Sequence, residues 1–282
     1  MKLLIDGVEY VFGQKLPPNG DKSIHLILVK LLIGPISINY GSKKLRQKIN
    51  YSTIPSSIQI LKQGTASFKK FASDYNVSLL PDEFIKNNLP NNREFFRDIL
   101  AEFSHYFIQT NSKSHLSAFV FIYRLLERMS YSFPLLYCKK EIDFFGTFQD
   151  LKNLFNLDSS GEHALFKKFL NQGKFIDKTI LDTTYIIDFS THSNRDIYFK
   201  TMVKLFKSFE STDPSTYQLS IKFREIPNLL IIIRNRFFHL RTGDGKNNIA
   251  IKNFGDPDDF FLELNKTFCS FLAVLVLHIL TI

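Results

Sequence analysis

Residues 229–240 of the chain read LLIIIRNRFFHL. The five leucine and isoleucine residues at 229–233 are apolar on every side, so the element they form must be buried on all sides. Isoleucine is also a strand former, and the run is compatible with a central strand. A helix is favoured, because helical periodicity dominates the preceding residues from about 92 and returns after the run. The charged groups that begin at Arg234 are then expected in an enclosed environment.

The chain around this run is predicted to be mainly helical, since apolar residues recur at the i, i+3, i+4, i+7 spacing of amphipathic helices. The expected helices cover residues 92–110, 114–131, 147–156, 161–171, 195–209, part of 217–240, and 258–281. Pro134 is expected to end the second of them soon after residue 131. Pro227 marks a break or a helix start, and Asp256 and Asp258 suit the N-terminus of the last helix.

The first forty residues contain short apolar runs that are typical of β-strands. Two apolar runs, 3–5 and 8–12, flank Asp6-Gly7, which is the signal of a two-residue hairpin. Residues 24–40 contain further apolar runs, whereas residues 41–92 are polar and predict irregular structure with room for one short helix.

The change from strand-like runs to helical periodicity predicts two domains. Residues 1–90 are expected to form a smaller β-containing region of unknown role. Residues 91–282 are expected to form an all-α domain. The fold class predicted for the whole chain is therefore mainly α.

The composition is basic and rich in phenylalanine. The formal net charge is +9, and the chain holds 30 Phe and 11 Tyr but no Trp. These counts predict a core built largely from phenylalanine. The charge favours phosphate-rich partners through counterion release, although an ordinary basic protein is equally compatible with it.

Neither a metal site nor a disulfide is predicted. Cys138 and Cys269 lie far apart without a C-x-x-C motif, which fits a reducing cytoplasm. The histidines form no His-x-x-x-His pair, so no metal or other cofactor is expected. Membrane insertion is not expected either, because the apolar run 268–282 is short and contains His278, which favours a buried helix.

Arg234-Asn235-x-x-x-His239 resembles the R-N-x-x-x-H motif of the HEPN superfamily. In that superfamily the motif lies on a late helix of an α-helical bundle, and one final helix follows it. The order of the expected helices fits this layout, so the resemblance covers about residues 92–282. It implies a HEPN-like domain at 91–282, catalytic roles for Arg234, Asn235 and His239, and a homodimer in which two motifs form one composite active site.

The residue types of this motif suit metal-independent cleavage of RNA. Histidine can take the proton from a ribose 2′-OH that attacks the neighbouring phosphate, because its ordinary pKa lies near neutrality. Arginine carries a fixed charge that can stabilise the charge developing on the phosphate. Residues four apart are displaced by about 40° around a helix, so Asn235 can orient the imidazole of His239. Residues five apart are displaced by about 140°, so Arg234 would reach the same cleft from another side.

Four further residues are candidates for supporting roles. Arg236, Arg241 and Lys246 could contact the phosphates of a substrate, although solvated charges and a turn at 243–246 are the alternative. Glu127 interrupts an apolar helix and could pair with Arg234, or make contacts within its own helix.

The sequence thus predicts a metal-independent endoribonuclease that acts on RNA. The superfamily's common setting implies a bacterial toxin or anti-phage defence effector, with an antitoxin or regulatory protein as a possible partner. The alternative is a degenerate motif in a non-catalytic dimerisation module that binds RNA or a nucleotide, or in the regulatory half of a two-component system. Neither interpretation identifies the RNA.

Overall fold

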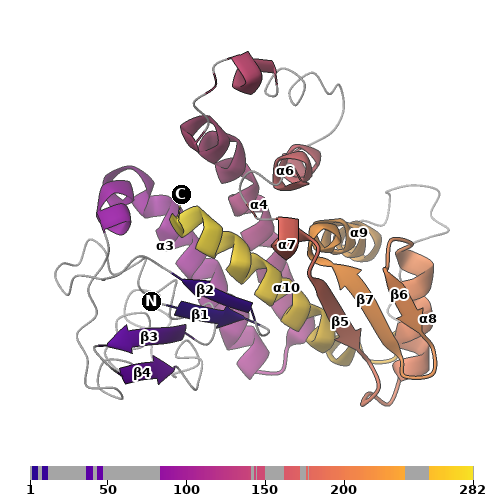
Figure 1. Ribbon diagram of the computed structural model, residues 1–282. Coiled ribbons are helices and arrows are strands. Elements are labelled where there is room, and N and C mark those ends of the chain that lie inside the picture. Colours follow the sequence, from indigo (N-terminus) through magenta and orange to yellow (C-terminus); the bar gives the residue numbers. More distant parts are fainter. Residues whose placement is uncertain are drawn as a thin grey trace. The chain divides into compact units, whose positions relative to one another are not determined.

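The computed structural model of the chain describes residues 2–5, 8–11, 36–40, 43–46, 83–140, 143, 145–149, 162–171, 176, 178–238 and 254–281. These residues are mainly helical and include two small antiparallel sheets (Figure 1), so the predicted mainly α fold class is confirmed. The chain divides into two compact units. Unit 1 comprises Met1–Lys113 and Leu272–Ile282, and unit 2 comprises Ser114–Phe271.

Unit 1 contains a four-stranded sheet of order β2-β1-β3-β4. Its strands are β1 (Lys2–Ile5), β2 (Val8–Val11), β3 (Ile36–Tyr40) and β4 (Lys43–Arg46). β1 and β2 pair antiparallel with Ile5 opposite Val8, which confirms the predicted hairpin. β4 is a strand in a stretch for which the sequence predicts irregular structure, and the apolar run at 24–33 lies outside the described residues.

Unit 1 also contains α3 (Glu83–Asn111), which is kinked at Asn92 (φ −120°, ψ 17°). The helical periodicity of the sequence begins at this kink. The apolar positions that follow it are buried, among them Phe96, Ile99 and Phe103. The predicted division of the chain at residue 91 stays a prediction.

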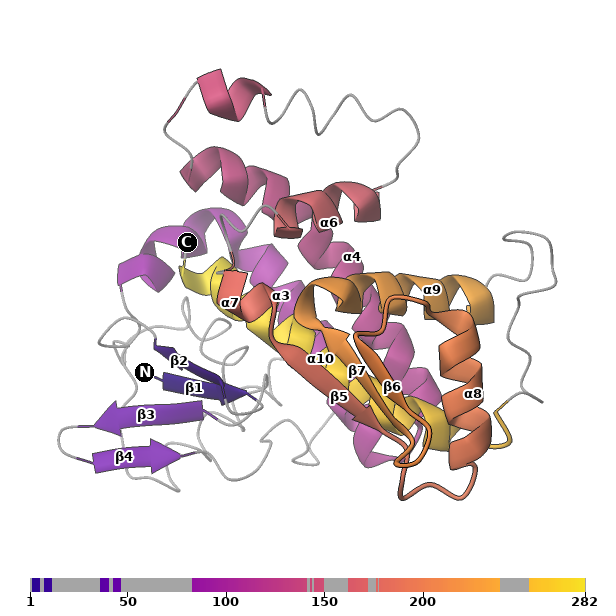
Figure 2. The same ribbon diagram turned by 45° about the vertical axis from the view of Figure 1, so that its right-hand side comes forward.

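Unit 2 combines helices with a three-stranded antiparallel sheet of order β5-β7-β6. Its elements are α4 (His115–Lys140), α6 (Glu162–Asn171), α7 (Lys178–Leu181), β5 (Thr184–Asp188), α8 (Arg195–Leu205), β6 (Ser211–Asp213), β7 (Gln218–Lys222), the 3₁₀ turn η2 (Phe223–Glu225), α9 (Ile226–Phe238) and the first part of α10 (Pro257–Thr281). Figure 2 shows the three strands side by side, with α8 next to β6. The helices predicted near 161–171, 195–209 and 258–281 are confirmed, while of 147–156 only 147–149 is described, as part of a helical turn.

The prediction of an all-α C-terminal part is wrong for residues 184–188, 211–213 and 218–222, which form the strands β5, β6 and β7. Along β5 the burial alternates, with Tyr185 and Ile187 buried and Ile186 exposed, which is the period of a half-buried strand. β5 pairs with β7 through five residues of each strand, Thr184 opposite Lys222 and Asp188 opposite Gln218. Such short runs carry a weak periodic signal, because a strand of five residues presents only two or three side chains to the core.

The expected end of α4 at Pro134 is also wrong, because the helix continues to Lys140. A proline inside a helix removes one backbone hydrogen bond, and packing on either side must offset that loss. Phe133 is buried and its ring meets the ring of Phe166 on α6 edge to face at 4.9 Å. This contact helps to keep the chain helical at Pro134.

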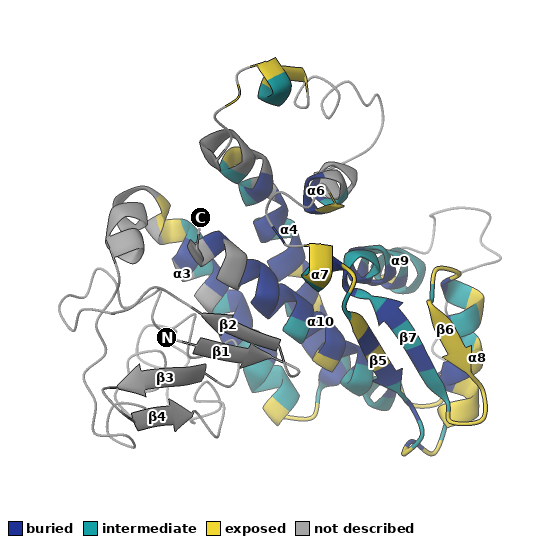
Figure 3. Ribbon diagram, in the orientation of Figure 1, coloured by how far each residue is buried: buried dark blue, intermediate teal, exposed yellow. Residues whose placement is uncertain are grey.

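The core of unit 2 is built from phenylalanine, as the composition predicts. Figure 3 shows many buried residues along α4 and α10, and in β5 and β7 the buried positions alternate with more exposed ones. The rings of Phe119, Phe254, Phe260 and Phe261 are all fully buried. Their contacts include Phe254–Phe260 at 4.3 Å and Phe119–Phe261 at 4.8 Å.

α10 carries the apolar run for which a buried helix is predicted. Residues 271–276 are buried one after another, and Phe268 and Ile279 are buried as well. In the described part of the chain, no helix has the length and apolar character that crossing a bilayer requires.

Candidate functional site

The R-N motif lies near the C-terminal end of α9, and the helix predicted for 229–233 is confirmed. Pro227 stands in the first turn, where its missing N–H would have had no partner in the helix. Leu229, Leu230 and Ile233 have no exposed surface, so the apolar run anchors the helix in the core. That anchoring positions Arg234, which follows Ile233 directly and is half-buried.

Arg234 is held by two neutral groups. Its Nη1 donates a hydrogen bond to Oδ1 of Asn235 at 2.9 Å. Its guanidinium carbon lies 4.6 Å from the centre of the Tyr123 ring on α4, in cation–π geometry. Among the described residues no carboxylate forms an ion pair with Arg234.

A second contact joins α4 and α9 one turn away from the first. The ring of Phe238 lies nearly parallel to that of Phe119, with centroids 5.8 Å apart and an interplanar angle of 6°. Phe119 and Tyr123 are four residues apart on α4, and Arg234 and Phe238 are four apart on α9, so each pair lies on one helix face. The two contacts therefore place Arg234 and Phe238 side by side along the same face of α9.

The other predicted site residues fall into two groups. His239, Arg241 and Lys246 lie outside the described residues. Arg236 is half-buried on α9, but residues two apart are displaced by about 200° around a helix. Arg236 and Arg234 therefore do not share a face.

Glu127 does not form the predicted ion pair with Arg234 in the part of the chain that the structure describes. The alternative, a contact within its own helix, is seen only at its backbone carbonyl, which accepts a hydrogen bond from Ser130 Oγ at 2.7 Å. Tyr123, one turn earlier on α4, occupies the position against the guanidinium instead. The sequence offers a weak signal for this contact, because nothing distinguishes Tyr123 from the other aromatic residues of an apolar helix.

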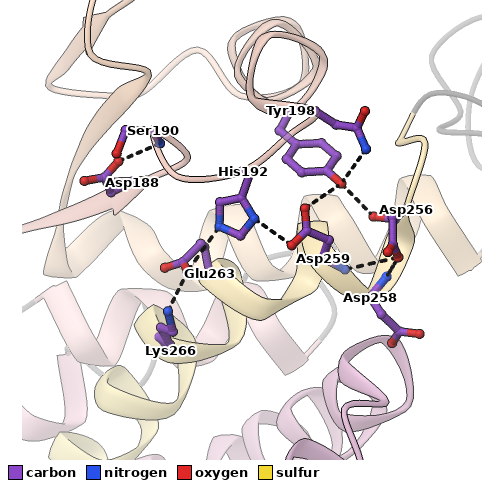
Figure 4. A network of polar contacts seen from close by, with 10 residues as sticks. Asp188, Ser190, His192, Tyr198, Asp256, Asp258, Asp259, Glu263 and Lys266 are labelled. Carbon is purple, nitrogen blue, oxygen red and sulfur yellow. Dashed lines mark hydrogen bonds and ion pairs between the residues drawn. The ribbon is translucent and has the colours of Figure 1, made fainter.

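A polar cluster that the sequence does not predict lies where the loop between β5 and α8 meets the start of α10 (Figure 4). His192 is buried, with Nδ1 at 2.7 Å from Asp259 Oδ1 and Nε2 at 3.2 Å from Glu263 Oε1. Asp259 and Glu263 are four apart on α10, so their spacing was visible in the sequence, but their partner was not.

Tyr198 on α8 extends this cluster. Its hydroxyl lies 3.1 Å from Asp259 Oδ2 and 3.0 Å from the carbonyl oxygen of Asp256, and it accepts a hydrogen bond from Asn194 at 3.3 Å. Burial raises the pKa of Tyr198 to about 12, and the neighbouring carboxylates act in the same direction. Gly255 faces Asn194 with φ of +69°, and a Cβ there would lie 2.9 Å from the Asn194 amide nitrogen. Both observations favour glycine at this turn.

The raised pKa of Tyr198 makes the unfolding free energy depend on pH in the alkaline range. The folded pKa of about 12 exceeds the ordinary value of 10.0, so the contribution is complete below pH 10 and is lost as the pH rises to about 12. The difference corresponds to about 2–3 kcal/mol of unfolding free energy. Denaturant unfolding between pH 9 and pH 12 measures it.

The matched control for this prediction is Tyr198→Phe, which keeps the ring and removes the ionising hydroxyl. Its unfolding free energy should fall less over the same range, since the other tyrosines and the lysines titrate in both proteins. Equal slopes for the two proteins would contradict the assigned role of Tyr198.

The start of α4 is tied to the start of α10. Asp258 Oδ1 accepts a hydrogen bond from the N–H of Leu116 at 2.7 Å, and the Asn265 amide donates to the carbonyl of His115 at 2.7 Å. Burial lowers the pKa of His115, outweighing the opposite effect of Asp258. Asp258 and Asn265 therefore each have a structural contact, and among the described residues no group of His, Cys, Asp and Glu suits a metal ion.

Comparison with known proteins gives no relative for this chain. No family model, no curated protein and no solved structure matches it.

Proposed function

We propose that this protein is a metal-independent endoribonuclease whose active site contains Arg234, Asn235 and His239. The observation that carries the proposal is the setting of Arg234. Its charge is half-buried and oriented, yet its partners among the described residues, Asn235 and the Tyr123 ring, are neutral.

Charges that are removed from water are usually paired with an opposite charge. Two other half-buried cations of unit 2 have such a partner: Arg224 pairs with Asp182 at 2.5 Å and Lys222 with Glu210 at 3.4 Å. Among the described residues Arg234 has no such partner, and we propose that the phosphate of a substrate takes this place. A phosphate diester fits the planar guanidinium, and the net charge of +9 favours a polyanionic substrate.

The proposed reaction needs only groups of the RNA and the protein. The ribose 2′-oxygen forms a bond to the adjacent phosphorus, and the bond from phosphorus to the 5′-oxygen of the next nucleotide breaks. His239 takes the 2′-OH proton, and a proton is delivered to the departing 5′-oxygen. Arg234 stabilises the negative charge on the phosphate, and Asn235 holds the guanidinium in place through its amide oxygen.

The homodimer and the role as a toxin or anti-phage effector belong to this proposal through the HEPN resemblance alone. The apolar run at 229–233 gives no separate reason for a dimer interface, because Leu229, Leu230 and Ile233 are already fully buried within the chain. In the proposed homodimer the second copy completes the composite active site. It is not needed to cover the apolar run. An antitoxin or regulatory partner is proposed on the same ground.

The test is to incubate the purified protein with total RNA in the presence of EDTA and to map the ends of the products. We expect cleavage that leaves a 2′,3′-cyclic phosphate and a 5′-hydroxyl, because the nucleophile belongs to the RNA. DNA of the same sequence should stay intact, since it lacks the 2′-OH.

A requirement for a divalent ion, or products with 5′-phosphates, would contradict the proposed chemistry. Binding of RNA without cleavage would favour the non-catalytic binding module instead.

A further inference from the structure

Phe238 packs against the core of unit 2 on one side, and its side chain is partly exposed to solvent. Its ring is 41% exposed, although it belongs to an apolar helix. It stacks on Phe119, which has no exposed surface and also contacts Phe261 at 4.8 Å and Phe268 at 6.0 Å. The ring of Phe237 meets it edge to face at 4.9 Å. These contacts fix the plane of the Phe238 ring.

Arg234 lies on the same face of α9, one turn before Phe238. Four residues correspond to a rise of about 6 Å along a helix, which is comparable to the distance between the phosphate and the base of one nucleotide. A guanidinium and an exposed aromatic ring at this spacing can bind the two ends of a nucleotide at once. Single-stranded nucleic acids are commonly bound in this way, by cations for the backbone and aromatic rings for the bases.

We propose that Phe238 is the stacking platform for a nucleobase of single-stranded RNA whose phosphate is bound by Arg234. This inference rests on the proposed function and adds the substrate class. In a duplex the bases are stacked on one another, so a platform of this kind selects unpaired loops or ends. Stacking tolerates every base, so Phe238 contributes affinity for an unpaired nucleotide and little base preference.

The absence of tryptophan from the chain allows a direct test. Phe238→Trp introduces a single indole whose fluorescence is quenched when a base stacks on it. The matched control is Ile197→Trp on α8, where the native side chain is 42% exposed and lies outside the proposed site. The probes are a 2′-O-methyl oligouridylate, which cannot be cleaved by 2′-oxygen attack, and a 2′-O-methyl abasic oligomer of equal length and charge.

We expect the oligouridylate to quench the indole fluorescence of the Phe238→Trp variant and the abasic oligomer to leave it unchanged. The fluorescence of the Ile197→Trp control should respond to neither probe. Equal quenching of the Phe238→Trp variant by both oligomers, or its binding of the oligouridylate without any quenching, would overturn the inference.

A second variant keeps the test decisive if the indole disturbs packing. Phe238→Leu preserves an apolar side chain and removes the ring, and it should weaken binding of the oligouridylate about tenfold or more. Its affinity for the abasic oligomer should equal that of the wild type, and unchanged affinity for both would overturn the inference. If the wild type binds no oligomer and cleaves no RNA, the proposed function itself fails and this inference fails with it. If it cleaves RNA while Phe238→Leu binds normally, only this inference fails.

Discussion

Arg234→Ala is expected to slow RNA cleavage by about 10²–10³-fold, the usual cost of losing one donor that stabilises transition-state charge. The loss should appear in the single-turnover rate at saturating RNA, because the guanidinium is proposed to act on the phosphate as it gains charge. The matched control is Arg195→Ala. Arg195 also lies over a tyrosine ring, 4.9 Å from the centre of Tyr217, but it is exposed and outside the proposed site.

The same assay separates the roles within the motif. His239→Ala should cost about 10²–10⁴-fold, as expected for the loss of a general acid or base. Asn235→Ala should cost less, because its amide oxygen positions the guanidinium and is not assigned a contact with the reacting phosphate. Full cleavage by His239→Ala, or equal losses from Arg195→Ala and Arg234→Ala, would contradict the assignment. The motif would then be structural, and the binding-module alternative would be preferred.

Phe119→Ala is expected to lower the unfolding free energy by about 3–5 kcal/mol, which is the usual range for removing a buried phenylalanine ring. Phe119 has no exposed surface, and its ring touches those of Phe238, Phe261 and Phe268. The cavity would therefore lie where α4, α9 and α10 meet. Denaturant unfolding measures the loss.

The neighbouring residue Val120 provides the control. It is 41% exposed on the same helix, so Val120→Ala should change the unfolding free energy by about 0.5 kcal/mol or less. Comparable losses for the two variants would mean that the aromatic contacts of Phe119 contribute little to unit 2.

Local patterns predicted the elements that depend on neighbouring residues. The hairpin of β1 and β2 follows from Asp6-Gly7, because a two-residue turn fixes the register of its own strands. α9 follows from its apolar run and from Pro227 at its start. α10 begins as its aspartates predict, with Asp256 Oδ1 accepting hydrogen bonds from the N–H groups of Asp258 and Asp259.

Contacts between distant residues could not be predicted in the same way. The residues around His192 in the sequence do not predict its contact with Asp259, which lies 67 residues later in the chain. The pairing of β5 with β7 and the course of α4 past Pro134 also depend on partners elsewhere in the fold. The candidate site shows the same division. The pattern of residues makes Arg234 and Asn235 candidates, whereas the aromatic rings that pack against this part of α9, Tyr123 and Phe119, required the structure.

The hydrogen bonds between α4 and α10 also bear on how the protein is made. The contacts from Asp258 to Leu116 and from Asn265 to His115 span 142 and 150 residues. A ribosome synthesises the chain from its N-terminus at about 5–20 residues per second, so α4 emerges roughly 7–30 s before the part of α10 that binds it. During that interval Phe119 lacks the rings of Phe261 and Phe268, and the nascent chain presents an aromatic helix face to the cell. Unit 2 can close its core only after α10 has left the exit tunnel, which makes this unit a candidate client for chaperones that act on nascent chains.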